Sequence, residues 1–226
     1  MVTKEASIIA SKCILQSTNL FKLHLKLNFM QEIILATNSD FRRKGFELLG
    51  MNFSSHGSRI NEKLKYRPRN PHDLVVFLAK RKARAVAKKY VNECVIGFDS
   101  VGYFEGELLE KPRSREETFE RLKELSGKHH QFYTGTFMIN LDTRKKASKV
   151  SKTDIYMREL SEREIRRYLD SCDECEEYIK KALGYSAFSG FSSTFVRRIE
   201  GSANNLNFGL PTELIPSMLE KVGFEF

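Results

Sequence analysis

The sequence predicts an α/β protein with a mixed, twisted sheet flanked by helices. Segments with helical periodicity alternate with short apolar runs, but without the strict strand–helix–strand rhythm of an all-parallel sheet. The 226 residues are enough to bury a substantial core, and a composition of 41% hydrophobic and 30% charged residues is typical of a folded, soluble protein.

The first expected elements are a strand at residues 32–37 and a helix at residues 39–50. Ser39 is placed to cap this helix and Gly50 to end it, because a serine hydroxyl accepts from free helix amides and glycine adopts the left-handed conformation. A second helix is expected at residues 73–90, where apolar residues recur with helical spacing among lysines and arginines.

The following elements are predicted from strand patterns and helix-capping signals. An apolar strand at residues 93–99 ends in Asp99, and residues 101–109 continue as a hairpin. Ser114 with Glu117 and Ser161 with Glu164 have the spacing of capping boxes, so each pair opens a helix. Further strands are expected at residues 131–141 and 153–159, the hairpin turn at Glu105-Gly106, and a last helix starting at Pro211.

The net charge and the cysteines restrict the kind of partner and the cellular compartment that the sequence predicts. The net charge of +9 favours an anionic partner, which can be a nucleotide, a nucleic acid or an acidic membrane surface. No apolar run approaches the roughly 20 residues of a membrane span. The motif Cys172-x-x-Cys175 lacks the context of a zinc or thioredoxin-like site. We therefore expect reduced thiols in a cytoplasmic protein that does not span a membrane.

Residues 1–29 differ in composition from the rest of the chain. They contain four lysines and one glutamate, a net charge of +3, and Met30 directly precedes the first expected strand. A transit peptide is one interpretation, although the segment has no arginine and no clear amphipathic period. We expect an extension outside the core fold, with one domain at residues 30–226.

Several residues are suited to triphosphate hydrolysis, which needs cations for the phosphates, acids for Mg²⁺ and a base that directs a water. Residues 37–43 combine hydroxyls, helix amides and Arg42 and Arg43 at a helix N-terminus, which fits a phosphate cradle as well as a plainly capped helix. Asp99 fits a ligand site at a strand end or a turn. Lys82 and Lys111, each taken singly, fit a surface position better than a ligand site, and Glu62 alone is as weak a signal. His129 and His130 are expected to have structural or surface roles.

The order of short motifs along the chain is more specific than any one of them. These motifs are residues 36–43, Asn61-Glu62, Leu78-Ala79-Lys80-Arg81-Lys82-Ala83, Gly97-Phe98-Asp99-Ser100-Val101, Lys111-Pro112, Leu125-Ser126-Gly127-Lys128-His129-His130, Tyr133-Thr134-Gly135, Gly201-Ser202-Ala203-Asn204-Asn205 and Gly209-Leu210-Pro211. In this order and spacing the chain resembles the Maf family over about residues 30–226.

The resemblance implies a fold akin to the inosine triphosphate pyrophosphatases, with two lobes around a cleft and often a homodimer. It implies a hydrolase of nucleotide metabolism, in which water attacks the α-phosphorus of a nucleoside triphosphate with Mg²⁺ or Mn²⁺ and releases the monophosphate and pyrophosphate. The alternative is a catalytically weak Maf-like regulatory or nucleic-acid-binding protein. Nucleic acid is the less favoured partner, because the basic residues 81–84 and 88–89 also fit a solvated helix face.

The resemblance also implies roles for individual residues. Asp99 would be the catalytic acid/base or a metal carboxylate, and Glu62 its companion at the metal. The phosphate- or substrate-binding residues would be Ser39, Arg42, Arg43, Lys82, Lys111 and Ser189.

Three positions depart from the family pattern: Asn61 stands for an aspartate, Phe41 for the first arginine, and Ser189 for a glutamine or glutamate before a glycine. Sliding the alignment by one residue restores the arginine pair as Arg42 and Arg43. An aromatic residue in place of the first arginine resembles the branch that acts on 7-methylguanosine triphosphate more than the dTTP/UTP branch, whereas Ser189 matches neither. These departures leave room for reduced activity.

Overall fold

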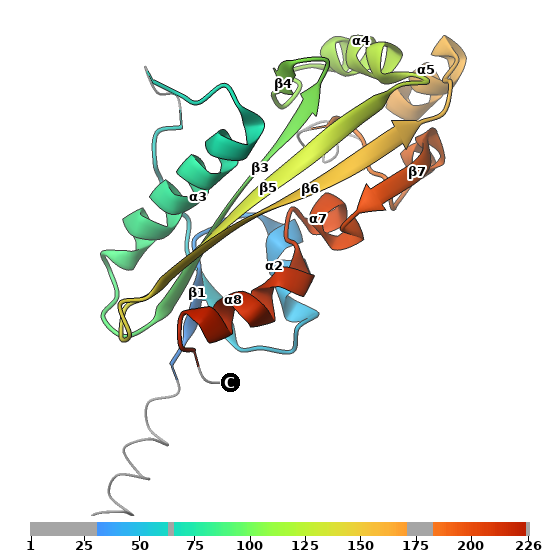
Figure 1. The fold of residues 1–226 in the computed structure, drawn as a ribbon. Helices are drawn as coiled ribbons and strands as arrows, with labels where there is room; N and C mark the ends of the chain where they lie inside the picture. Colours follow the sequence, from blue (N-terminus) through green and yellow to red (C-terminus); the bar gives the residue numbers. More distant parts are fainter. Residues whose placement is uncertain (1–30, 63–65, 171–182, 225–226) are drawn as a thin grey trace, which may run out of the picture.

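The computed structural model describes residues 31–62, 66–170 and 183–224. Its centre is a seven-stranded sheet in the order β2-β1-β3-β5-β6-β7, with β4 paired to β3 (Figure 1). Strand β1 is parallel to β2 and β3, and the remaining pairs are antiparallel. The predicted α/β class with a mixed sheet is confirmed.

The element bounds are as follows. The strands are β1 Ile33–Leu35, β2 Phe53–Ser55, β3 Cys94–Phe104, β4 Glu107–Leu109, β5 His129–Asn140, β6 Lys146–Met157 and β7 Val196–Gly201. The helices are α2 Asp40–Glu47, α3 Pro71–Ala87, α4 Arg115–Leu125, α5 Glu162–Asp170, α7 Ala203–Phe208 and α8 Ile215–Lys221, with 3-10 helices η1 Phe191–Phe195 and η2 Thr212–Leu214.

The long strands β3, β5 and β6 connect two lobes, each with its own apolar core. In one lobe α2 and α8 pack on β1 and the first half of β3, with Phe46 and Met218 fully buried. In the other, α4 and α5 pack near the far ends of the long strands around Leu122 and Ile165 (Figure 1). The same strands thus hold both lobes in a fixed relation.

Helix α3 covers one face of the sheet at very short distance, whereas α2, α7 and α8 lie on the other side (Figure 1). Two glycines permit this approach. A Cβ atom at Gly97 would lie 2.2 Å from the carbonyl oxygen of Ala79, and one at Gly135 would lie 2.5 Å from that of Val75. Because real side chains do not tolerate such contacts, the bare backbone of β3 and β5 fixes the height of α3 above the sheet.

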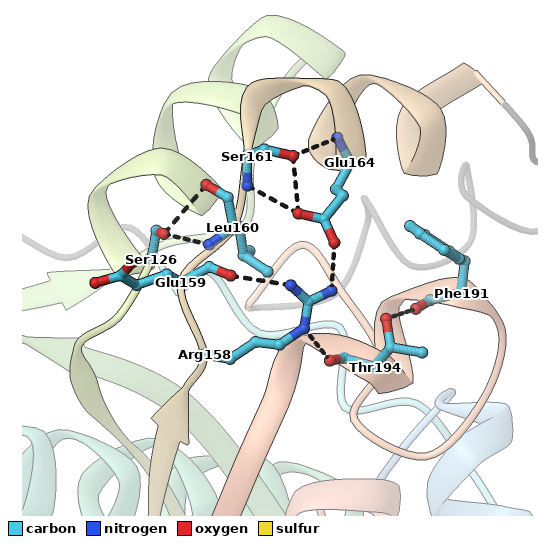
Figure 2. A network of polar contacts seen from close by, with 8 residues as sticks. All are labelled: Ser126, Arg158, Glu159, Leu160, Ser161, Glu164, Phe191 and Thr194. Atoms are coloured by element: carbon cyan, nitrogen blue, oxygen red, sulfur yellow. Dashed lines mark hydrogen bonds and ion pairs between the residues drawn. The ribbon is translucent and has the colours of Figure 1, made fainter.

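A polar network around Arg158, which directly follows β6, joins the end of this strand to α5 and η1 in the second lobe (Figure 2). Its guanidinium donates to Glu164 Oε1 at 2.7 Å on α5 and to the carbonyl oxygen of Thr194 at 2.7 Å in η1. Ser161 and Glu164 form the predicted capping box, since each backbone N–H is bound by the other side chain. The network thus holds η1 against α5, and the chain continues directly from η1 into strand β7.

The start of α2 and the hairpin after β3 were predicted correctly, and α3 was predicted with a shifted start. The Ser39 side chain accepts from the backbone N–H of Arg42, and the β3–β4 turn occurs at Glu105 and Gly106. Helix α3 begins earlier than expected, because Asn70 caps it and Pro71 occupies its first turn.

The predictions for the end of β3 and for the start of the last helix were wrong. Strand β3 does not end at Asp99 but continues to Phe104, because β5 pairs with it as far as Tyr103. The last helix does not start at Pro211, whose non-helical ψ of 85° precedes η2, and α8 begins at Ile215.

Strands β2 and β7 and helix α7 were not anticipated from the sequence. Cys172 and Cys175 lie outside the described residues.

Candidate active site

An interruption in one edge of the sheet creates the site. Strand β1 pairs with β3 only as far as Leu35 opposite Ile96, and β4 begins its pairing with Leu109 opposite Gly102. Between these points no strand in the described part of the chain covers that side of β3. Asp99 and Ser100 lie in the gap and, as neighbours in a strand, point to opposite faces of the sheet.

Lys82 meets Asp99 on the face covered by α3. Its Nζ atom lies 2.6 Å from Asp99 Oδ1 and 2.9 Å from Glu62 Oε1. The Lys82 side chain is 13% exposed and that of Asp99 is 9% exposed, whereas Glu62 is half exposed. One ammonium group therefore contacts two carboxylates from separate segments in a partly dehydrated environment.

The environment of Asp99 acts on its pKa in opposing directions. Burial raises the pKa of Asp99 above its ordinary value, and the nearby Glu62 charge adds to this. Lys82 and Arg42 act against the increase by stabilising the charged form. The net shift of the pKa is upward, which makes this carboxylate a better proton acceptor than an exposed aspartate.

Arg42 occupies the gap from the other face of the sheet. Its guanidinium donates to Ser100 Oγ at 2.9 Å, to the carbonyl oxygen of Phe98 at 3.4 Å and to that of Gly209 at 3.1 Å. The Phe98 carbonyl points to the side on which β1 has already ended, so Arg42 replaces a missing strand partner.

The contact with Arg42 explains why the motif Gly209-Leu210-Pro211 begins with a glycine. Burial lowers the pKa of Arg42, and the charges of Asp99 and Glu62 oppose that shift. Gly209 ends α7 with a left-handed φ of +62°, and a Cβ atom there would lie 3.1 Å from Ser100 Oγ. Glycine therefore allows the chain to present its carbonyl to Arg42 at this close approach.

Arg42, Lys82, Glu62, Ser100 and Gly209 border a cavity of about 670 Å³, within the size range of pockets for small ligands. Its polar lining includes Ser39, Arg42, Glu62, Lys82 and Lys111. Its apolar lining includes Phe132, Leu183, Tyr185, Phe188 and Phe208. Lys111 is exposed and makes no ion pair or hydrogen bond to any residue that the structure describes, so its ammonium group is available to an anion.

Three of the predicted residues do not line this cavity. Arg43 is 43% exposed and forms an ion pair with Asp40 on its own helix. Ser189 hydrogen-bonds to Ser186 Oγ at 2.9 Å and does not line the cavity, whereas Ser186 and Phe188 do. Asp99 meets the cavity through Lys82 rather than directly.

Sequence reasoning missed Ser100, Thr134 and the apolar lining of the cavity. Ser100 Oγ lies 2.7 Å from Thr134 Oγ1 on the paired strand, which completes the surroundings of Arg42. A signal was present for both hydroxyls, because each belongs to a motif already noted. The apolar lining had none, since an aromatic residue that lines a cavity looks in sequence like one in a core.

The geometry is that of a nucleotide pyrophosphatase, a hydrolase of acid anhydrides: Glu62 and several cationic side chains line one cavity of a mixed α/β fold, and Asp99 lies behind Lys82. The model of the Maf-like protein family matches residues 32–222. The chain belongs to the Maf family.

Individual relatives agree with this assignment. A protein of Pelotomaculum thermopropionicum named dTTP/UTP pyrophosphatase is 35% identical over 195 residues, which are 86% of this chain and 98% of that protein. A dTTP/UTP pyrophosphatase of Methanosarcina barkeri is 35% identical over 195 residues, 86% of this chain and 95% of that protein.

Among solved structures, a nucleoside-triphosphatase (dITP/XTP pyrophosphatase) of Mycobacterium abscessus is similar with 13% identity and a TM-score of 0.38, covering 56% of this chain and 74% of the other. Within the described residues, no helix has the length and apolar character needed to cross a bilayer.

Proposed function

We propose that the protein hydrolyses nucleoside triphosphates to the monophosphate and pyrophosphate at the cavity between the two lobes. The observation that carries the proposal is the meeting of Lys82, Asp99 and Glu62 beside Arg42, although these residues come from four separate segments. Cations that lie close together repel one another, so a shared anion is the best reason for Lys111 to join them around one cavity.

Roles follow from the surroundings of each residue. Asp99, with its raised pKa, accepts the proton as a water oxygen bonds to the α-phosphorus. The bond from that phosphorus to the bridging oxygen breaks, and pyrophosphate leaves. Lys82 and Lys111 neutralise phosphate charge, and Ser39 adds its hydroxyl and the free amides of the α2 N-terminus. Arg42 contributes positive charge and orients Ser100.

A divalent cation, Mg²⁺ or Mn²⁺, fits this set of donors. Glu62 and Asp99 already share one positive charge, which indicates that their oxygens face a common point. The described residues contain no group of three or more histidine, cysteine or acidic side chains, so the protein alone offers few ligands. Mg²⁺ usually takes one or two carboxylates together with substrate phosphates, and the bound cation would neutralise developing phosphate charge.

The names of the relatives support dTTP and UTP as the first substrates to test. Phe41 lines the cavity and keeps 7-methylguanosine triphosphate as the second candidate. The test is a panel of these three nucleotides with ATP, with Mg²⁺ or Mn²⁺, and pyrophosphate release as the readout. Turnover of at least one nucleotide is expected. Absence of pyrophosphate with every nucleotide would refute the proposal and favour a catalytically inactive, regulatory Maf-like protein.

A further inference from the structure

The apolar lining of the cavity includes one continuous segment, residues 183–188, which we call the wall. Every residue of the wall except Gly184 lines the cavity. Phe132 and Phe208 extend the same apolar surface. The cationic residues Arg42, Lys82 and Lys111 line the same cavity, so a triphosphate bound to them would leave its nucleoside to contact this apolar lining.

Hydrogen bonds tie the wall to the second lobe at three consecutive residues. The Tyr168 hydroxyl donates to the carbonyl oxygen of Gly184 at 3.0 Å. The Ser192 hydroxyl accepts from the Ser186 N–H and donates to its carbonyl oxygen, both at 3.0 Å. Between these, the Tyr185 hydroxyl lies 2.7 Å from His130 Nε2. His130 is the tie that comes from β5, at the centre of the sheet.

His130 and Tyr185 form an isolated buried pair. Their side chains belong to residues that are 1% and 3% exposed, and their rings meet edge to face with centroids 5.9 Å apart. Burial lowers the pKa of His130 to about 3, so its ring is neutral at physiological pH. The other ring nitrogen, Nδ1, has no hydrogen-bond partner in the described structure. The single polar contact of this imidazole is therefore the one to the wall.

If position 130 only filled the core, a histidine there would lower the stability of the fold relative to an apolar residue. A buried polar atom without a partner costs free energy, and an apolar ring of similar size would leave no Nδ1 unsatisfied. The one polar contact that His130 makes in return places Tyr185, a residue of the cavity. The polar side chain of His130 is therefore explained by its role in holding the wall in position.

We propose that His130 is a positioning residue, which through the Tyr185 hydroxyl holds the wall where it contacts the nucleoside of a bound nucleotide. The inference rests on the proposed function, because it requires a nucleotide in the cavity. It assigns His130 to affinity for the nucleoside and not to the chemistry at phosphorus, from which it is separated by Tyr185.

The test compares His130→Phe, His130→Gln and Tyr185→Phe with dTTP as substrate and inorganic tripolyphosphate as a competitive inhibitor without a nucleoside. His130→Phe and Tyr185→Phe should each raise KM about three- to tenfold, the usual value of one hydrogen bond, and leave kcat within about twofold. The inhibition constant of tripolyphosphate should stay unchanged. His130→Gln, which keeps a polar group in reach, should recover most of the wild-type KM.

Two further variants sharpen the test. His129→Phe changes the neighbouring histidine, which binds Asp154 on the opposite face of the sheet, and should leave KM unchanged. The double variant His130→Phe/Tyr185→Phe should be no worse than either single variant, because both remove the same bond.

An unchanged KM in folded His130→Phe and Tyr185→Phe would overturn the inference, as would an equal loss of tripolyphosphate binding. If His130→Phe does not fold, Tyr185→Phe decides alone, since it removes one oxygen and keeps the ring. Inactivity of the wild-type protein with all nucleotides would refute the proposed function instead.

Discussion

Lys82 and Asp99 form an ion pair of 2.6 Å in which both side chains are largely removed from solvent. The pair settles the resting state of the site, because the Lys82 ammonium group contacts both Asp99 and Glu62. On the proposed function, phosphate groups and a divalent cation would redistribute these contacts, with the metal on the carboxylates and the lysine on the phosphates. The resting and loaded sites would then differ in the partner of one lysine.

Asp99→Asn should lower turnover by about 10²-fold or more, because loss of a general base or metal carboxylate typically costs at least that. The variant should fold, since asparagine has the same size and still accepts a hydrogen bond from Lys82. Pyrophosphate release together with a thermal melt measures both. Asp154→Asn is the matched control on the same sheet, and its turnover should be normal. Near wild-type turnover in Asp99→Asn would remove this residue from the mechanism.

Lys82→Ala and Lys111→Ala should each reduce kcat/KM at least about tenfold, the effect of losing one charge-assisted contact to phosphate. The two variants should differ in metal binding. Lys82→Ala frees two carboxylates and should tighten Mn²⁺ binding measured by electron paramagnetic resonance without nucleotide. Lys111 has no acidic partner in the described structure, so Lys111→Ala should leave Mn²⁺ affinity unchanged. Equal Mn²⁺ affinity in both variants would contradict this division.

Glu164→Gln should reduce thermal stability at neutral pH but not near pH 2. Hydrogen bonds from Arg158, then from the backbone and hydroxyl of Ser161, lower the pKa of Glu164 from its ordinary 4.5 to about 2. Between these values the unfolded chain binds more protons than the folded protein, so stability rises with pH and is complete above about 4.5.

The difference in melting temperature between wild type and Glu164→Gln should therefore shrink as pH falls from 4.5 towards 2. Glu220→Gln, at an exposed position on α8, is the control and should give a small difference at every pH. A Glu164→Gln difference that stays constant over this range would show that the carboxylate charge is not what the network stabilises.

A protein that begins at Met30 should fold and keep full turnover. The composition of residues 1–29 motivates this prediction, and the match to the family model begins at residue 32. Gln31 provides the first described anchor, with its side-chain amide 2.7 Å from Asn140 Oδ1. Melting temperature and pyrophosphate release relative to the full chain are the measurements. Aggregation, or a large loss of stability, would indicate that residues 1–29 pack on residues 30–226.

Local signals allowed much of the fold to be predicted from the sequence. Ser39 caps α2 as expected, and the chain turns at Gly106 as expected, because a cap and a tight turn depend on a few neighbouring residues. Strand β6 was predicted to start at residue 153 but starts at Lys146. Its first half is mostly exposed, so it lacks the apolar alternation that identifies a strand.

The sequence identified many of the residues of the site but not the long-range contacts that bring them together. Nothing local distinguishes Arg42 from Arg43, and the choice depends on Gly209, which lies 167 positions away from Arg42. The place of Asp99 was inferred from a strand end, whereas the end that matters is that of β1, the neighbouring strand. Long-range pairing of this kind leaves no trace in the residues around either position.

The shortness of β1 has a consequence for how activity can be lost. The strand has three residues and stops at Leu35, so the Phe98 carbonyl is left for Arg42. Two more extended residues in β1 would satisfy that carbonyl through the backbone and fill the space of the guanidinium. If Arg42 acts as proposed, such an insertion would abolish turnover although every side chain of the motifs persisted. On the proposed function, part of the information for catalysis then resides in where a strand ends, which a comparison of motif residues alone would overlook.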